Sequence, residues 1–163
     1  YIMQLDVTNV AWNNSGVFDN TAPTSTVFSV DGGSGMSGES GKTYIAYCFS
    51  EVEGYSKFGS FEGNGNANGI FVYLGFKAAF FMVKNIDEAN SWRMWDNKRV
   101  GYNEVENYLS PDSSGGEGTT NLDIDILSNG IKLRNTNDSA NKSSNTYIYL
   151  AFAESPFKHS NAR

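Results

Sequence analysis

The side chains that most often carry out chemistry are few in this 163-residue chain, and they are not grouped along it. The single histidine, His159, lies in a polar C-terminal stretch, so no Ser/His/Asp or Cys/His catalytic set can be assembled around it. The single cysteine, Cys48, excludes an internal disulfide and a Cys-based zinc site. Cys48 sits in an aromatic run that recurs later in the chain with Ala151 in its place, so we expect a small, buried core residue and not a reactive nucleophile.

Two carboxylates, Asp123 and Asp125, alternate along one predicted strand, and paired carboxylates can carry out glycoside hydrolysis. They lie opposite the apolar face formed by Leu122, Ile124 and Ile126. We therefore expect both carboxylates on the solvent side of a half-buried strand, without a catalytic role. With no other set of catalytic residues, the sequence predicts a protein that is not an enzyme.

Three loops resemble ligand-binding sequences. Gly63–Gly69 has glycines spaced one residue too far apart for a dinucleotide fingerprint and leads into a strand, which indicates a connecting loop. The oxygens of Asp31-Gly32-Gly33 and Asp112-Ser113-Ser114-Gly115 could bind calcium, but neither loop has the full spacing of an EF-hand. Turn chemistry explains both loops, so we expect no cofactor, with calcium as the alternative.

The best ligand-binding candidates are aromatic. Trp92 and Trp95, with Tyr102 close in sequence, could form a platform for a sugar ring or a stacked base. Along a strand, side chains three positions apart point to opposite faces. At most one of the two tryptophans can therefore be exposed on that strand, and the other belongs to the core.

Composition narrows the class of protein. The net charge is −6 with 12 Lys and Arg residues, which argues against nucleic acid as a partner, because phosphate contacts need clustered basic residues. No apolar run approaches the roughly 18 residues of a membrane helix, so we expect no membrane insertion. Aromatic residues make up 14% of the chain, and 17 Gly accompany only 3 Pro, which is typical of strands joined by turns.

Period-two alternation dominates, and no helical pattern exceeds two turns. The pattern predicts an all-β protein, an antiparallel, jelly-roll-like β-sandwich. Aromatic and apolar residues on both faces place Thr43–Glu51, Ala79–Lys84 and Thr146–Ala153 inside the sheets. The predicted strands are Ile2–Thr8, Val27–Val30, Thr43–Glu51, Lys57–Glu62, Ile70–Leu74, Ala79–Lys84, Ser91–Asp96, Leu122–Leu127, Ile131–Arg134 and Thr146–Ala153.

Two local elements are also predicted. Asn129-Gly130 lies between two apolar strands and suits a type I′ hairpin turn, which needs two positive φ angles. Asn103–Leu109 could form a helical turn, with Asn103 as its cap and Pro111 ending it.

One strand sequence occurs twice. Thr43–Glu51 returns 103 residues later as Thr146–Glu154, with five of nine positions identical, and the same offset lays Val27–Val30 over Gly130–Leu133. A repeat of this length predicts modules in series. We expect residues 1–51 to be the C-terminal part of a first module and 52–157 to be a complete second sandwich, which may pack with 1–51 as one sandwich. Residues 158–163 should form an exposed tail.

Longer motifs extend over nearly the whole chain: Trp12–Asn14, Pro23–Val30, Thr43–Phe49, Glu53–Phe61, Gly63–Gly65, Phe71–Phe80, Trp92–Asp96, Asp125–Arg134 and Thr146–Phe157. Together they resemble a repeat domain of structural proteins of tailed bacteriophages, especially marine ones, which often follows a concanavalin- or laminin-G-like lectin domain. Phe71 is a departure, because similar sequences are expected to have proline there.

The resemblance implies a protein of the virion surface: a fibre, head-decoration or tail-appendage subunit without catalytic residues. It implies a homo-oligomer, such as a trimer, that contacts other virion proteins and a host glycan. Two alternatives stay open on the sequence. They are a carbohydrate-binding module of a secreted bacterial protein and a subunit of an extracellular filament or surface layer.

Overall fold

A computed structural model describes residues 1–32 and 38–155. The chain divides into two compact units: unit 1 contains Tyr1–Met3 and Ala11–Phe49, and unit 2 contains Gln4–Val10 and Ser50–Arg163. His159 and the predicted tail at 158–163 lie outside the described residues, as does Gly33 of the first candidate calcium loop.

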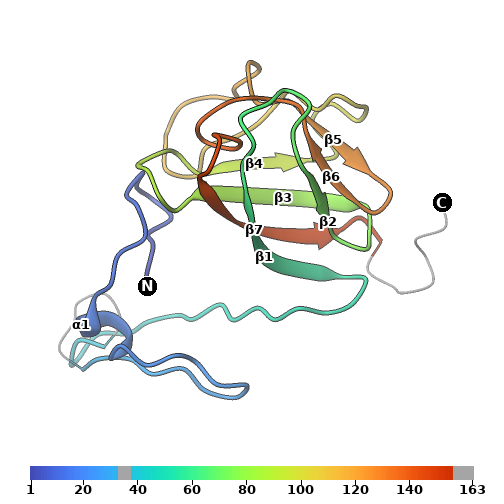
Figure 1. Cartoon of the computed structure of the whole chain (residues 1–163). Helices are drawn as coiled ribbons and strands as arrows, with labels where there is room; N and C mark the ends of the chain where they lie inside the picture. The colour runs from blue at the N-terminus through green and yellow to red at the C-terminus, as the bar shows by residue number, and fades with distance from the viewer. Residues whose placement is uncertain (33–37, 156–163) are drawn as a thin grey trace. The chain divides into compact units, whose positions relative to one another are not determined.

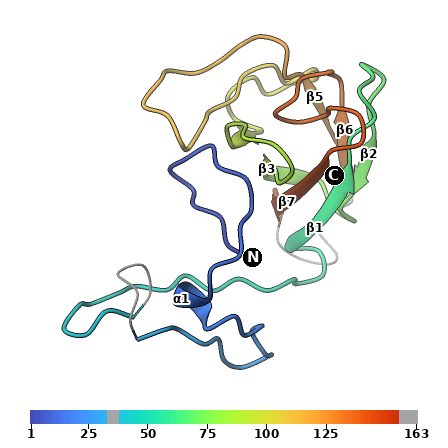
Figure 2. The same ribbon diagram turned by 60° about the vertical axis from the view of Figure 1, so that its left-hand side comes forward.

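Unit 2 contains two antiparallel sheets (Figure 1). In the four-stranded sheet, neighbouring strands follow the order β1-β7-β3-β4, and in the three-stranded sheet the order is β2-β6-β5. Figure 2 shows β2, β6 and β5 as one layer beside the layer that contains β3, β7 and β1. The strand bounds are β1 Ser56–Glu62, β2 Phe71–Tyr73, β3 Ala78–Asn85, β4 Arg93–Asp96, β5 Ile124–Leu127, β6 Gly130–Leu133 and β7 Thr146–Ala153.

The core of unit 2 lies between these two sheets, because alternate residues of each strand point inward. Phe81 of β3 and Trp95 of β4 lie across from each other in the register, and their ring centroids are 6.0 Å apart. Ile131 and Leu133 of β6 bring the apolar face of the second sheet into the same cluster, and both are fully buried. The predicted all-β sandwich is therefore confirmed.

The seven predicted strands from Lys57 onward are all present, with ends shifted by at most two residues. β3 is interior, paired with β7 on one side and β4 on the other, as its two apolar faces predict. β7 is also interior, between β1 and β3.

The predicted hairpin forms, but one residue earlier than expected and with a different turn. Leu127 pairs with Gly130, so the two-residue connection is Ser128–Asn129, and neither residue has a positive φ. The prediction of a type I′ turn at Asn129-Gly130 is therefore wrong. Gly130 is required for another reason, because a Cβ there would lie 2.3 Å from the carbonyl oxygen of Val72.

The helical turn predicted at Asn103–Leu109 is also wrong. Val105 bridges to Ile124 of β5, and Leu109 bridges to Met94 of β4. Extended pairing with both sheets satisfies these backbone groups in place of a helical turn.

Unit 1 is built differently. Its helix α1, Ser15–Phe18, begins after Asn14, whose side-chain oxygen accepts a hydrogen bond from the Gly16 N–H at 2.9 Å. Ile2 and Trp12 form an isolated antiparallel bridge. In the described part of unit 1, α1 is the only helix and no strand longer than this bridge is present.

Three predicted strands are therefore not formed: Ile2–Thr8, Val27–Val30 and Thr43–Glu51. The aromatic stretch was expected in a sheet interior, but Ile45 is 78% exposed and Tyr47 80% exposed. Cys48, expected to be buried, is exposed as well. The physical reason is the absence of flanking strands in the described part of unit 1, because an extended segment is buried only when neighbouring strands cover it.

Candidate functional site

The three aromatic candidates do not form one open platform. Trp95 is 1% exposed in the core, where its indole N–H donates to the Leu122 carbonyl oxygen at 3.1 Å. Trp92 is 7% exposed, and its indole N–H donates to the Gln4 carbonyl oxygen at 2.9 Å. Only Tyr102 has a largely exposed side chain, at 74%.

The two neighbouring carboxylates differ in their surroundings. Asp125 is buried and pairs with Arg134, whose Nε lies 2.7 Å from the Asp125 Oδ2 atom. The expectation that it faces solvent is therefore wrong, because Arg134 folds over it. Asp123 is half-buried, and burial followed by repulsion from Glu106 raises the pKa of its carboxyl group.

The glycine-rich loop Gly63–Gly69 is fixed to the sandwich by Asn141. The Asn141 Oδ1 atom accepts from the Asn64 N–H at 3.0 Å, and the Asn141 Nδ2 atom donates to the Asn66 carbonyl at 2.9 Å. Gly63 allows the backbone of this loop to lie close to the backbone of Lys142, since a Cβ at position 63 would lie 2.3 Å from the Lys142 carbonyl oxygen. The loop is thus a structural connection with an anchored geometry.

The second candidate calcium loop also has a structural contact. The Asp112 Oδ1 atom accepts from the backbone N–H of Trp92 at 2.9 Å, which ties the loop to the start of β4. Within residues 1–32 and 38–155, no three His, Cys, Asp or Glu side chains gather in a way that could hold a metal ion. A search of the same residues found no helix with the length and apolar character needed to span a membrane.

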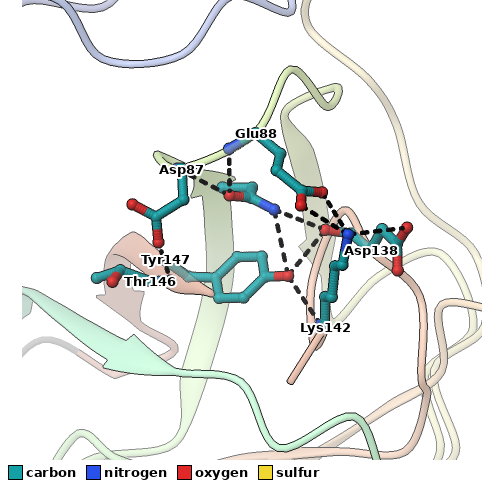
Figure 3. Close-up of polar contacts among 7 residues, drawn as sticks. Asp87, Glu88, Asp138, Lys142, Thr146 and Tyr147 are labelled. Carbon is teal, nitrogen blue, oxygen red and sulfur yellow. Dashed lines mark hydrogen bonds and ion pairs between the residues drawn. The ribbon is translucent and has the colours of Figure 1, made fainter. Parts of the chain in front are cut away.

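A polar clamp, defined as Asn85, Glu88, Asp138, Lys142 and Tyr147, joins the end of β3 to the start of β7. Figure 3 shows Glu88, Asp138, Lys142 and Tyr147 of this clamp. The fully buried Tyr147 donates its hydroxyl to the Asp138 carbonyl oxygen at 2.8 Å and accepts from the Lys142 N–H at 2.8 Å. The buried Asn85 also donates to the Asp138 carbonyl oxygen, at 3.0 Å.

An ion pair completes the polar clamp. Lys142 Nζ lies 2.6 and 2.7 Å from the two carboxylate oxygens of Glu88. This hydrogen bond lowers the pKa of Glu88 and raises the pKa of Lys142. Burial raises the pKa of Tyr147 to about 12, so its hydroxyl stays protonated as a donor over the ordinary pH range. The clamp therefore fastens the loop that follows β3 to the loop that precedes β7.

Most residues of the polar clamp carry no signal in the sequence. One signal was present, because Tyr147 is among the five residues shared by the two copies of the strand. Asn85 and Lys142 carry no such signal, since their role depends on loops that meet only in the folded chain.

The outer face of the four-stranded sheet carries an apolar groove, defined by Phe58, Met82, Trp92, Ile148 and Leu150. These residues come from β1, β3 and β7, with Trp92 directly before β4, and in the register Leu150 lies between Phe58 and Met82. Thr8 lies nearby on the same face, because its carbonyl accepts from the buried Lys84 Nζ at 3.1 Å. An apolar groove on an outer sheet face suits contact with another protein surface.

Comparison with known proteins places this architecture in a family. A family model described as a domain of unknown function, DUF7483, matches residues 1–156. The chain belongs to the DUF7483 family. The DUF7483 match spans both copies of the repeated strand, Thr43–Glu51 and Thr146–Glu154. Searches of curated proteins and of solved structures each gave no match.

Proposed function

We propose that this DUF7483 chain is a non-enzymatic structural protein of a bacteriophage particle: a fibre, head-decoration or tail-appendage subunit exposed on the virion surface. The observation that carries the proposal is the second copy of the β7 sequence at Thr43–Glu51, because a repeated strand sequence indicates β-sandwich modules arranged in series. Such an array extends a surface away from a particle, and its function is mechanical and adhesive.

The construction of unit 2 supports a mechanical role. Each interior strand is paired on both sides, and the polar clamp fastens the end of the sandwich where β3 and β7 meet. Every strong contact within this clamp is internal, so it stabilises the module without requiring a ligand.

The apolar groove supports a role in assembly. A groove lined by Phe58, Met82 and Leu150 gains free energy when a second apolar surface covers it. Further copies of the chain, as a homotrimer or a larger symmetric set, and other virion proteins are the partners that this proposal names. Host glycans are contacted by exposed loops.

The particle itself tests the proposal. Antibodies against this chain should label purified phage particles at a fixed position in negative-stain electron microscopy, and mass spectrometry of the same particles should detect the chain. Particles from a phage that lacks the gene provide the control. Absence of the chain from intact, purified particles would remove the assignment.

A carbohydrate-binding module of a secreted bacterial protein is the second candidate, and the exposed ring of Tyr102 favours it. Glycan-array binding that is lost in Tyr102→Ala but retained in Tyr73→Ala, another exposed tyrosine, would promote this function. Trp92→Ala and Trp95→Ala need a parallel folding measurement, because both indoles are buried. A subunit of an extracellular filament or surface layer is a third alternative.

A further inference from the structure

The turns before the two copies of the repeated strand have the same geometry. In unit 2 the Lys142 N–H donates to the Tyr147 hydroxyl at 2.8 Å. In unit 1 the Glu39 N–H donates to the Tyr44 hydroxyl at 3.2 Å. Both bonds join residues five apart, and Glu39 and Tyr44 lie 103 positions before Lys142 and Tyr147.

The backbone of the turn agrees as well. Asn145 donates its N–H to the Lys142 carbonyl at 3.3 Å, and Lys42 donates to the Glu39 carbonyl at 3.2 Å. The third residue of each turn has a positive φ, 64° at Ser144 and 77° at Gly41. Only one of the four turn residues is identical between the copies, so the shared geometry does not simply follow from a shared sequence.

The strands that follow these turns have different surroundings. β7 lies between β1 and β3, and its Tyr147 and Ala151 are fully buried. At the corresponding positions of unit 1, Tyr44 is 42% exposed and Cys48 is exposed. The copy therefore begins like β7 but is not covered like β7 in the described part of unit 1.

Val27–Val30 repeats this contrast at the same offset. Phe28 and Val30 are 46% and 47% exposed, whereas their counterparts Ile131 and Leu133 in β6 are fully buried. Two segments of unit 1 thus carry the sequence character of β6 and β7, core strands that follow each other in the chain and lie in different sheets. Both segments lack the burial that apolar side chains favour.

We propose that Thr43–Phe49 is the seventh strand of another sandwich module, and that it docks between β1- and β3-like strands supplied by a preceding copy of the module in a tandem array. β7 defines the register: Cys48 takes the place of Ala151, opposite the residues equivalent to Lys57 and Phe81. Tyr44 takes the place of Tyr147, which stacks on Phe61 with ring centroids 5.2 Å apart.

The partner of Thr43–Phe49 must have an open position between its β1- and β3-like strands. A complete second copy of this chain already has β7 in the position between β1 and β3. A preceding copy that supplies β1- to β4-like strands leaves that position open for Thr43–Phe49. This inference extends the structural role proposed above to the way in which modules are joined, and it does not depend on the particle that carries them.

A fusion tests the docking directly. A copy of Ser50–Asn103 is placed immediately before Tyr1, which is the junction that the 103-residue offset requires. This segment contains no cysteine, so Cys48 stays the only thiol in the fusion. If Cys48 in the fusion is buried as Ala151 is, its thiol can react only after the docked strand opens locally. Reaction of Cys48 with a disulfide reagent should therefore be about 100-fold slower in the fusion than in the original chain.

A matched control keeps the result specific. Phe81→Pro, made only in the added copy, removes a pairing position of its β3-like strand, and Cys48 should then react as fast as in the original chain. Circular dichroism of all three proteins checks that unit 2 remains folded. Equal reactivity of Cys48 in the original chain and in the unaltered fusion would overturn the proposal.

A cross-link tests the register. Lys57→Cys in the added copy should form a disulfide with Cys48, because the Cα atoms of facing antiparallel residues lie about 4.5–5.5 Å apart. Ser60→Cys in the added copy lies three residues along the strand, roughly 10 Å away, and should form none. Equal cross-linking at both positions would contradict the register.

The original chain without the fusion tests the alternative partner, which is a second copy of the same chain. Protection of Cys48 that increases with the concentration of the original chain would identify a second copy as the partner and overturn the tandem arrangement. Labelling of particles tests the virion assignment separately, so either proposal can fail without the other.

Discussion

At the scale of the residue, Tyr147 shows how one side chain can contribute both apolar packing and hydrogen bonds to the sandwich. Its ring stacks on Phe61, while its hydroxyl uses both a donor and an acceptor function in the polar clamp. The same tyrosine occurs in the other copy as Tyr44, where it makes the equivalent contact with the preceding turn. The conserved element of the repeat is thus a hydrogen bond as well as an apolar pattern.

The raised pKa of Tyr147 predicts a loss of stability at high pH. An unfolded tyrosine has a pKa near 10, and the folded value is about 12, so the stabilisation is complete below pH 10 and is lost as the pH rises toward 12. The loss should be about 2 to 3 kcal/mol in the free energy of unfolding, measured by urea titration between pH 9 and 12.

Tyr147→Phe provides the test of this cause. At pH 9 the variant should be less stable by about 1 to 3 kcal/mol, because the Lys142 N–H loses its acceptor in a buried setting. Its stability should then fall less steeply above pH 10 than that of the unaltered chain. Tyr102→Phe, in an exposed ring, should change neither quantity. Parallel pH curves for the unaltered chain and Tyr147→Phe would show that another group titrates.

The buried carboxylate Asp125 gives a second prediction at this scale. Arg134→Ala leaves the charge of Asp125 without its partner, so the free energy of unfolding should fall by about 1 to 3 kcal/mol. Lys77→Ala removes a more exposed pair with Glu154 and should cost less than about 1 kcal/mol. Thermal unfolding at neutral pH measures both, and equal shifts would contradict the difference in burial.

At the scale of the element, alternation together with runs that are apolar on both faces was sufficient to predict the seven strands of unit 2. Phe81 and Trp95, for example, face each other across β3 and β4. The apolar run at Thr43–Glu51 produced a wrong expectation, because strand sequence specifies which face can be buried but not whether partner strands are present. The turn of the β5–β6 hairpin was also missed, since Gly130 is fixed by a neighbouring carbonyl and not by its own φ.

The close contact at Gly130 predicts that a larger side chain there destabilises the pairing of β2 with β6. Gly130→Ala places a Cβ 2.3 Å from the Val72 carbonyl oxygen, so β2 and β6 must separate. Overpacking of this kind should lower the free energy of unfolding by about 1 to 3 kcal/mol in a denaturant titration. Gly116→Ala is the matched control, because a Cβ there meets no atom within 4 Å, and its stability should be unchanged. Equal stability of the two variants would show that β2 adjusts without cost.

At the scale of the whole molecule, the repeat in the sequence predicts modules, but the surfaces available for contact depend on how the strands come together in the fold. The sequence allows one of Trp92 and Trp95 to be exposed, but both indoles are buried, and Trp92 only lines the apolar groove. The groove itself brings together residues from β1, β3 and β7, so no single stretch of sequence could reveal it. The polar clamp was missed for the same reason.

The groove leads to the prediction about self-association. If copies of the chain meet through this face, light scattering after gel filtration should give a mass that is a multiple of 17.9 kDa. Leu150→Lys places a charge in the groove and should shift the chain toward the monomer, because burying an unpaired ammonium group is unfavourable. Ser114→Lys adds the same charge in an exposed loop and should leave the mass unchanged. A monomeric mass for the unaltered chain at every concentration would contradict association through the groove, while equal masses for both variants would place the contact elsewhere.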